Sequence, residues 1–111
     1  MKLDSVGEVI ANRKLSLVRV NQEPVEVEVS MGRPMKFPDH TDFYCPYEIK
    51  GLGRGKVRAA GGIDAFQAMQ LALGTIAVEL EVLQKESGRK LSWDAGDEGY
   101  LGFPERESKK E

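Results

Sequence analysis

The sequence predicts an α+β domain, in which an antiparallel sheet of four or more strands carries one long helix packed on one face. Two segments predict the sheet, because residues 25–31 and 43–49 place apolar side chains at every second position. The helix is predicted from residues 64–86, the one long segment with a helical apolar period. A chain of 111 residues is long enough to bury one such core.

The first two strands are predicted from valine, isoleucine and leucine. Residues 9–20 are rich in them, but the alternation changes parity near Leu17 and Val18, which predicts a bulge or a strand buried on both faces. Residues 25–31 place valines and Met31 on one face and glutamates on the other. One face of this strand is therefore expected to be buried and the other solvated.

Two further strands complete a predicted meander. In residues 43–49, Phe43, Cys45, Tyr47 and Ile49 share the face that is expected to be buried. Pro46 has no N–H to donate, so it predicts an edge position or a bulge. A glycine-rich turn then leads to a short return strand at 56–60.

The helix has recognisable ends. Asp64 is an acidic N-cap whose partner in a variant capping box is Gln67, and Gly88 suits the left-handed position after the last turn. Gly74 inside the helix marks either a close backbone approach or an incidental choice. Six apolar residues fall on one face, which we expect to pack on the sheet: Phe66, Met69, Leu73, Ile76, Leu80 and Leu83.

A second apolar stripe, roughly opposite the first, consists of Leu71, Thr75, Val78 and Val82. A helix on one side of a sheet needs only one stripe, so the second is either covered or exposed. One candidate cover is the C-terminal arm, with Leu91, Trp93, Leu101 and Phe103. The other is a second copy of the chain or a different protein, which makes this stripe a candidate interaction surface.

Composition limits the class of protein. The formal net charge of −2 argues against a dedicated nucleic-acid binder, and one cysteine excludes an internal disulfide. We see neither a signal peptide nor a run of about 18 apolar residues, so we expect a cytoplasmic protein with no membrane partner. Residues 1–8 are expected to be loose, 9–104 to form a single domain and 105–111 to be a charged, disordered tail.

One region concentrates side chains that are capable of chemistry. Arg33, His40, Asp42, Tyr44 and Cys45 form a candidate small-ligand or enzymatic site. Zinc usually takes cysteine and histidine ligands in pairs, and here there is one of each. The alternation points Cys45 into the core, away from the exposed setting that a nucleophile needs. We therefore expect no catalytic residue, no metal and no cofactor.

A weaker alternative is RNA binding by a basic hairpin at residues 50–58. Its cations are Lys50, Arg54, Lys56 and Arg58, with Tyr44 and Tyr47 nearby. The glycines before Lys56 do not form a phosphate loop. Val57 and a strand follow Lys56, whereas a phosphate loop requires Ser or Thr and then a helix.

Several strings of the sequence resemble those of one family of small bacterial proteins of unknown function. They are Gly32-Arg33-Pro34, Phe43-Tyr44-Cys45-Pro46-Tyr47-Glu48-Ile49, Gly51-Leu52-Gly53, the helix start Asp64-Ala65-Phe66-Gln67-Ala68, Trp93 and Leu101-Gly102-Phe103-Pro104. The resemblance spans residues 9–104. It implies a bacterial origin and an α+β domain, and it carries over no catalytic residue.

The second helix stripe and the lack of a catalytic constellation favour a non-enzymatic protein-interaction module. It would be a homodimer or a small antagonist of the toxin-immunity type. A ligand or enzymatic site within residues 33–47, and RNA binding by residues 50–58, are the alternatives.

Overall fold

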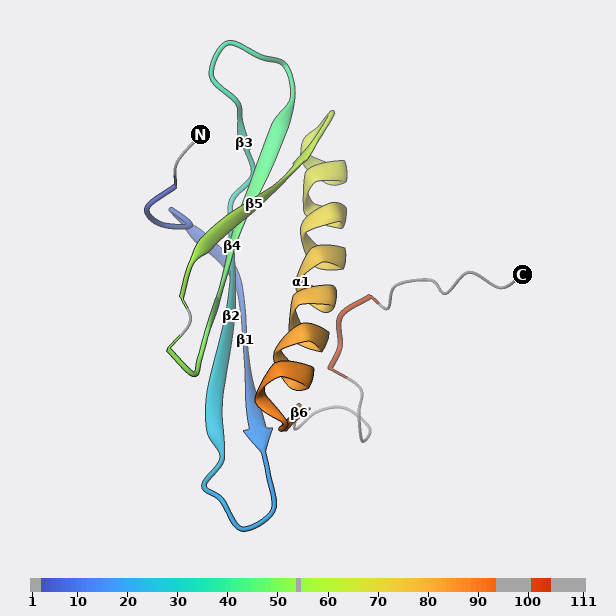
Figure 1. Ribbon diagram of the computed structural model, residues 1–111. Helices are drawn as coiled ribbons and strands as arrows, with labels where there is room; N and C mark the ends of the chain where they lie inside the picture. Colours follow the sequence, from blue (N-terminus) through green and yellow to red (C-terminus); the bar gives the residue numbers. More distant parts are fainter. Residues whose placement is uncertain (1–2, 54, 94–100, 105–111) are drawn as a thin grey trace, which may run out of the picture.

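Six strands and one helix make up the part of the chain that the computed structural model describes, which is residues 3–53, 55–93 and 101–104. In chain order they are β1 (Val9–Val18), β2 (Val25–Gly32), β3 (Met35–Lys36), β4 (Phe43–Lys50), β5 (Val57–Gly62), α1 (Ala65–Ser87) and β6 (Lys90–Ser92). The strands form one sheet and α1 lies along one of its faces, so the domain has two layers (Figure 1). The predicted α+β fold is confirmed.

The sheet is antiparallel throughout. Strands β1, β2, β4 and β5 follow one another across it, as the predicted meander requires. The short strand β6 pairs with residues 16–18 of β1, and β3 continues the β2 side of β4, where Met35 faces Tyr44. The sheet therefore ends in β5 on one side and in β1 with β6 on the other.

Strand β4 is an inner strand, so Pro46 is not at a sheet edge. It lies opposite Ala59 of β5, in the gap between the β2 ladder, which reaches Tyr47, and the β3 ladder, which reaches Tyr44. A residue without an N–H suits this gap, because the ladder is already interrupted there.

The prediction of a bulge or of burial on both faces near Leu17 and Val18 is wrong. The register of β1 shifts between Val9 and Ala11 instead. Leu15 and Leu17 are buried two positions apart, whereas Val18 is exposed at the end of the strand. Single exposed apolar residues are common, so two adjacent apolar residues did not require a bulge.

The core lies between the sheet and α1. Its sheet side contains Leu15, Leu17, Val27, Val29, Met31, Cys45, Tyr47 and Ile49, and its helix side contains Ala68, Ala72, Ile76, Leu80 and Leu83. The four predicted inward residues of β4 all contact this core, Phe43 from a half-buried position. Leu91 of β6 is buried in the same cluster.

Both predicted ends of the helix are confirmed. The Asp64 side chain accepts a hydrogen bond from the Gln67 backbone N–H at 2.8 Å, and Gln67 Oε1 accepts one from the Ile63 N–H at 2.8 Å. Gly88 follows the last turn with a φ of 69°, in the left-handed region. The helix thus begins and ends where its capping residues require.

The buried face of α1 is rotated from the predicted one. Of the six residues expected to pack on the sheet, three are buried and Met69 and Leu73 are half-buried, but Phe66 is 78% exposed. The assignment of Phe66 to the core is wrong. Ala68 is buried instead, because the helix begins against the backbone of Gly62 in β5.

The two terminal segments lie on opposite sides of the domain (Figure 1). Val6, within the stretch expected to be loose, is buried, and its carbonyl lies against Gly32 on the outer face of the sheet. The C-terminal arm, residues 101–104, packs against the core on the helix side. The tail expected at 105–111 lies outside the described residues.

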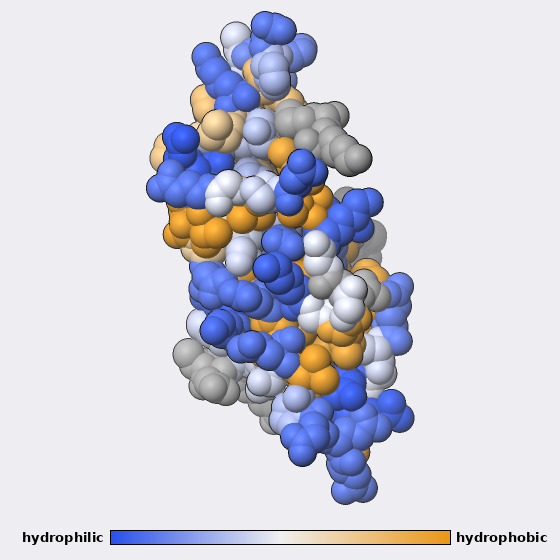
Figure 2. Space-filling view, turned by 90° about the vertical axis from the view of Figure 1, so that its left-hand side faces the viewer, coloured by the Kyte–Doolittle hydropathy of each residue, from blue (hydrophilic) through white to orange (hydrophobic). Residues whose placement is uncertain are grey.

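The sheet face that is turned away from α1 is mostly hydrophilic, with smaller hydrophobic areas (Figure 2).

By length and composition alone, α1 is apolar enough to cross a membrane, although it contains no unbroken apolar run. Core helices of soluble proteins can have the same length and apolar composition. Here α1 buries five residues against the sheet and leaves other apolar residues exposed.

Gly74 has open space around it, because an added Cβ would meet no atom within 4 Å. No close approach therefore explains this glycine, and Gly74→Ala is expected to raise the free energy of unfolding by about 1 kcal/mol. Urea denaturation measures the change. Gly88→Ala is the control and is expected to lower stability, since its positive φ favours glycine. A loss of stability in Gly74→Ala would contradict this account.

Candidate functional site

The five residues predicted as a ligand or enzymatic site lie in three different places. Arg33 and Tyr44 line a small pocket of about 180 Å³ between the N-terminal segment and the outer face of the sheet. His40 and Asp42 are exposed in the loop between β3 and β4. The Cys45 side chain lies on the other face of β4 and points into the core.

The contacts of these residues hold the loop and the N-terminal segment on the sheet. Arg33 Nε lies 3.3 Å from Glu8 Oε1 in an exposed ion pair, which is worth about 0–1 kcal/mol. The Tyr44 ring packs beside Phe37 with a centroid distance of 5.1 Å. The His40 backbone N–H donates to the Phe37 carbonyl at 3.2 Å and closes the loop.

Cys45 has the environment of a core residue. It is fully buried, and its Sγ donates a hydrogen bond to the Gly32 carbonyl oxygen at 3.6 Å. Burial raises the pKa of the Cys45 thiol from 9.0 to about 11, whereas a nucleophilic cysteine needs a lowered pKa. No group of three or more His, Cys, Asp or Glu that could hold a metal ion occurs among the described residues.

The basic hairpin is partly neutralised by the helix. Lys50 and Lys56 are exposed, but Arg58 Nε lies 3.5 Å from Glu79 Oε1 of α1. Arg54 lies outside the described residues. Part of the positive charge expected to bind RNA is therefore engaged within the domain.

The second apolar stripe of α1, called the outer stripe below, consists of Leu71, Thr75, Val78 and Val82. Leu71 is 49% exposed and Val82 41%, while Val78 is half-buried. The C-terminal arm reaches a different flank of the helix, where Phe103 shares a pocket with Leu73 and Ile76. Leu73 is about 200° around the helix from Leu71. The described part of the arm therefore contacts the flank of α1 that is opposite to the outer stripe.

The outer stripe lies on the side of the helix where β5 is the edge strand. Glu79, on the same flank as Thr75 and Val82, forms the ion pair with Arg58 of β5. Among the described strands, β5 pairs with β4 alone, so its second edge is free. A free strand edge and an exposed apolar stripe therefore adjoin each other.

Tyr47 connects the three elements of this flank. Its ring is buried in the core, and its hydroxyl donates a hydrogen bond to Glu79 Oε2 at 2.8 Å. Burial and, after it, the neighbouring Glu79 carboxylate raise the pKa of Tyr47 above the ordinary value of 10.0. The protonated hydroxyl and Arg58 hold the Glu79 carboxylate between them.

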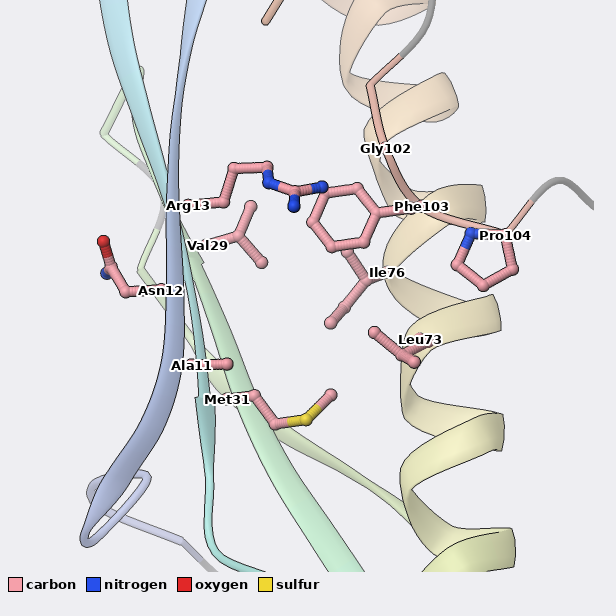
Figure 3. Close-up of a pocket in the computed structure, with 10 residues that line it drawn as sticks. All are labelled: Ala11, Asn12, Arg13, Val29, Met31, Leu73, Ile76, Gly102, Phe103 and Pro104. Atoms are coloured by element: carbon pink, nitrogen blue, oxygen red, sulfur yellow. The ribbon is translucent and has the colours of Figure 1, made fainter. Parts of the chain in front are cut away.

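A second candidate site lies on the opposite flank. A pocket of about 470 Å³ opens between β1, α1 and the C-terminal arm (Figure 3). Its apolar lining consists of Ala11, Val29, Met31, Leu73, Ile76, Phe103 and Pro104. The charged side chain of this lining is Arg13, which extends from β1 toward α1 and Phe103 in Figure 3.

The Arg13 guanidinium is stacked on two aromatic rings. Its Cζ lies 3.8 Å from the ring centroid of Trp93 and 4.8 Å from that of Phe103, and Nη1 donates to the Leu101 carbonyl at 2.9 Å. Gly102 permits this approach, because its φ is 80° and an added Cβ would press on Nη1 and on the Trp93 ring. Arg13 thus anchors the C-terminal arm by cation–π contacts.

The sequence prediction did not include Arg13 as a site residue, although a signal was present. Arg13 lies two and four positions before Leu15 and Leu17 and pairs with Val29, so it belongs to the sheet face that is turned toward the helix. A cation at an inward position needs partners. Those partners belong to a segment as far as 88 residues away in the chain, which local patterns do not reveal.

Comparison with known proteins identifies a family. The model of a domain of unknown function, DUF6968, matches residues 11–105. The comparisons with curated proteins and with solved structures returned no match.

Proposed function

The chain belongs to the DUF6968 family, and from its geometry we propose that it is a non-enzymatic interaction module that forms a homodimer through β5 and the outer stripe of α1. The observation that carries this proposal is the position of the free β5 edge beside the exposed outer stripe. A strand edge offers unpaired N–H and C=O groups, and the stripe offers apolar surface.

The edge of β5 is suited to pairing with a second β5. Four small residues occupy its second half: Ala59, Ala60, Gly61 and Gly62. Its one charged residue, Arg58, is held by Glu79. Edges that avoid association usually carry lysine, proline or a bulge, and β5 has none of these within its bounds.

A two-fold axis beside β5 would join both features of the surface. It pairs β5 antiparallel with its copy and brings the two outer stripes together above the joined strands, because both helices lie on the same face. Leu71 and Val82 then bury apolar surface, and the Thr75 hydroxyl already donates to the Leu71 carbonyl at 2.7 Å. A second copy therefore satisfies the strand edge and the stripe at once.

We expect Val82→Glu to weaken the dimer more than tenfold, because it places a charge within the apolar surface that the two copies would bury. Sedimentation velocity or light scattering at several concentrations measures this change. Val20→Glu is the matched control: Val20 is 82% exposed in the turn between β1 and β2, away from β5, and its variant should dimerise like the original chain.

Hydrogen exchange tests the strand pairing directly. In a dimer, the outward amide groups of β5 are protected from exchange. Val82→Glu should remove that protection and leave the protection of the β2 amide groups unchanged. A chain that remains a monomer at every concentration contradicts the homodimer and favours a different protein partner. A dimer that Val82→Glu leaves unchanged contradicts the proposed surface.

A further inference from the structure

We propose that the pocket between β1, α1 and the C-terminal arm binds a small carboxylate with an apolar tail, with the carboxylate on Arg13. This site lies on the flank opposite the proposed dimer surface and goes beyond that function. Its volume of about 470 Å³ falls within the range of about 300–1,000 Å³ that is typical of small-molecule sites.

The charge of Arg13 is the first argument for an anionic ligand. The guanidinium has five N–H groups, and one of them donates to Leu101. Among the described residues it has no carboxylate partner; its neighbours are the faces of Trp93 and Phe103 and one carbonyl. These contacts orient the guanidinium, and none of them neutralises its positive charge.

The guanidinium geometry favours a carboxylate. The planar fork of arginine donates two parallel hydrogen bonds to the two oxygens of a carboxylate. Stacking on Trp93 holds the plane of the fork, since the ring centroid is 3.8 Å from Cζ. A single arginine also matches the single charge of such a group.

The lining of the pocket supplies the second argument, which is for an apolar tail. Val29, Met31 and Ile76 form its floor in the core, and Leu73 and Phe103 form its sides. Figure 3 shows these side chains directed into the space between β1 and α1. A tail that displaces water from this lining gains roughly 25 cal/mol per Å² of apolar surface buried.

Decanoate is the test ligand, used below its micelle concentration, with decanol and acetate as its tail-only and charge-only analogues. Trp93, the one tryptophan of the chain, stacks on Arg13 and reports binding through its fluorescence; calorimetry gives the affinity. We expect decanoate to bind at least tenfold more tightly than either analogue. A hydrogen bond to a charged group contributes that much relative to decanol, and burial of the apolar tail contributes it relative to acetate.

Two variants and a matched control locate the ligand. Arg13→Met keeps an apolar stem and removes the charge, so it should weaken the binding of decanoate at least tenfold more than that of decanol. Ala11→Phe fills the pocket and should weaken both ligands. Lys14→Met removes one cation from the next position of β1, which is exposed, and should change neither affinity.

The comparison of ligands on the original chain does not depend on how any variant folds. Equal affinity for decanoate and decanol would overturn the role of Arg13. Failure of decanoate to bind at millimolar concentration would overturn the site. Neither result affects the homodimer, which is measured by oligomeric state alone.

Discussion

Replacing Gly62 by alanine is expected to lower the free energy of unfolding by about 1–3 kcal/mol, although it adds a single methyl group. The added Cβ would lie 2.5 Å from the backbone nitrogen of Ala68 and 2.9 Å from the backbone carbon of Gln67. Both atoms belong to the first turns of α1. The helix must therefore move away from β5 to make room.

The neighbouring glycine provides a matched control. At Gly61 the nearest atom to an added Cβ is Cε2 of Phe37 at 3.6 Å, which is an ordinary van der Waals contact. Gly61→Ala is expected to leave stability unchanged or to raise it by about 0.5–1 kcal/mol, since glycine is unfavourable inside a strand. The two variants differ only in which face of β5 receives the methyl group.

Urea denaturation of both variants beside the original chain measures the difference. A shift in the midpoint at constant slope reports the change in stability. Equal stabilities of Gly61→Ala and Gly62→Ala would show that the helix does not rest on the backbone of β5, and would remove our explanation for the exposure of Phe66.

The exposure of Phe66 illustrates what the sequence predicts and what it does not. Caps are local signals, so Asp64 and Gly88 predicted both ends of α1 correctly. The buried face depends on where a small residue lets the helix approach the sheet. The apolar period ranks Phe66 above Ala68 by hydrophobicity, whereas close packing against Gly62 selects the alanine.

The strands show the same division. Alternation in β2 and β4 predicted their inward faces, because that pattern is written within eight residues. The partners of Pro46 depend on strand order, which no local pattern contains, and so the prediction of an edge position or a bulge was wrong. Arg13 depends on contacts with Trp93 and Phe103, and the candidate pocket was therefore outside the reach of the sequence.

The largest pH effect is expected at alkaline pH, where two buried side chains resist ionisation. The pKa of Cys45 is raised from 9.0 to about 11 by burial, so below pH 9 the thiol is protonated in both folded and unfolded chains. Above pH 9 the unfolded chain loses this proton while the folded chain keeps it. Ionisation thus favours the unfolded state, and stability falls as pH rises.

The size of the effect follows from the shift. Each pH unit between 9 and about 11 removes about 1.4 kcal/mol, so Cys45 alone accounts for about 3 kcal/mol over the interval. Tyr47 adds to the loss above pH 10, because burial and the Glu79 carboxylate raise its pKa as well. The free energy of unfolding of a marginally stable domain is roughly 5–15 kcal/mol, so the loss at alkaline pH is a large part of it.

Single variants separate the two groups. Urea denaturation in steps from neutral pH to about pH 11 should show a decline that begins near pH 9 in the original chain. Cys45→Ala removes the decline between pH 9 and 10 and the share of Cys45 in the decline up to about pH 11, and Tyr47→Phe removes the additional part above pH 10. If the Cys45→Ala chain loses stability between pH 9 and 10 as steeply as the original chain, the Cys45 thiol of the original chain ionises in the folded state. Cys45 would then be accessible to solvent and open to reaction, and the site predicted from Arg33 to Cys45 would again require a chemical explanation.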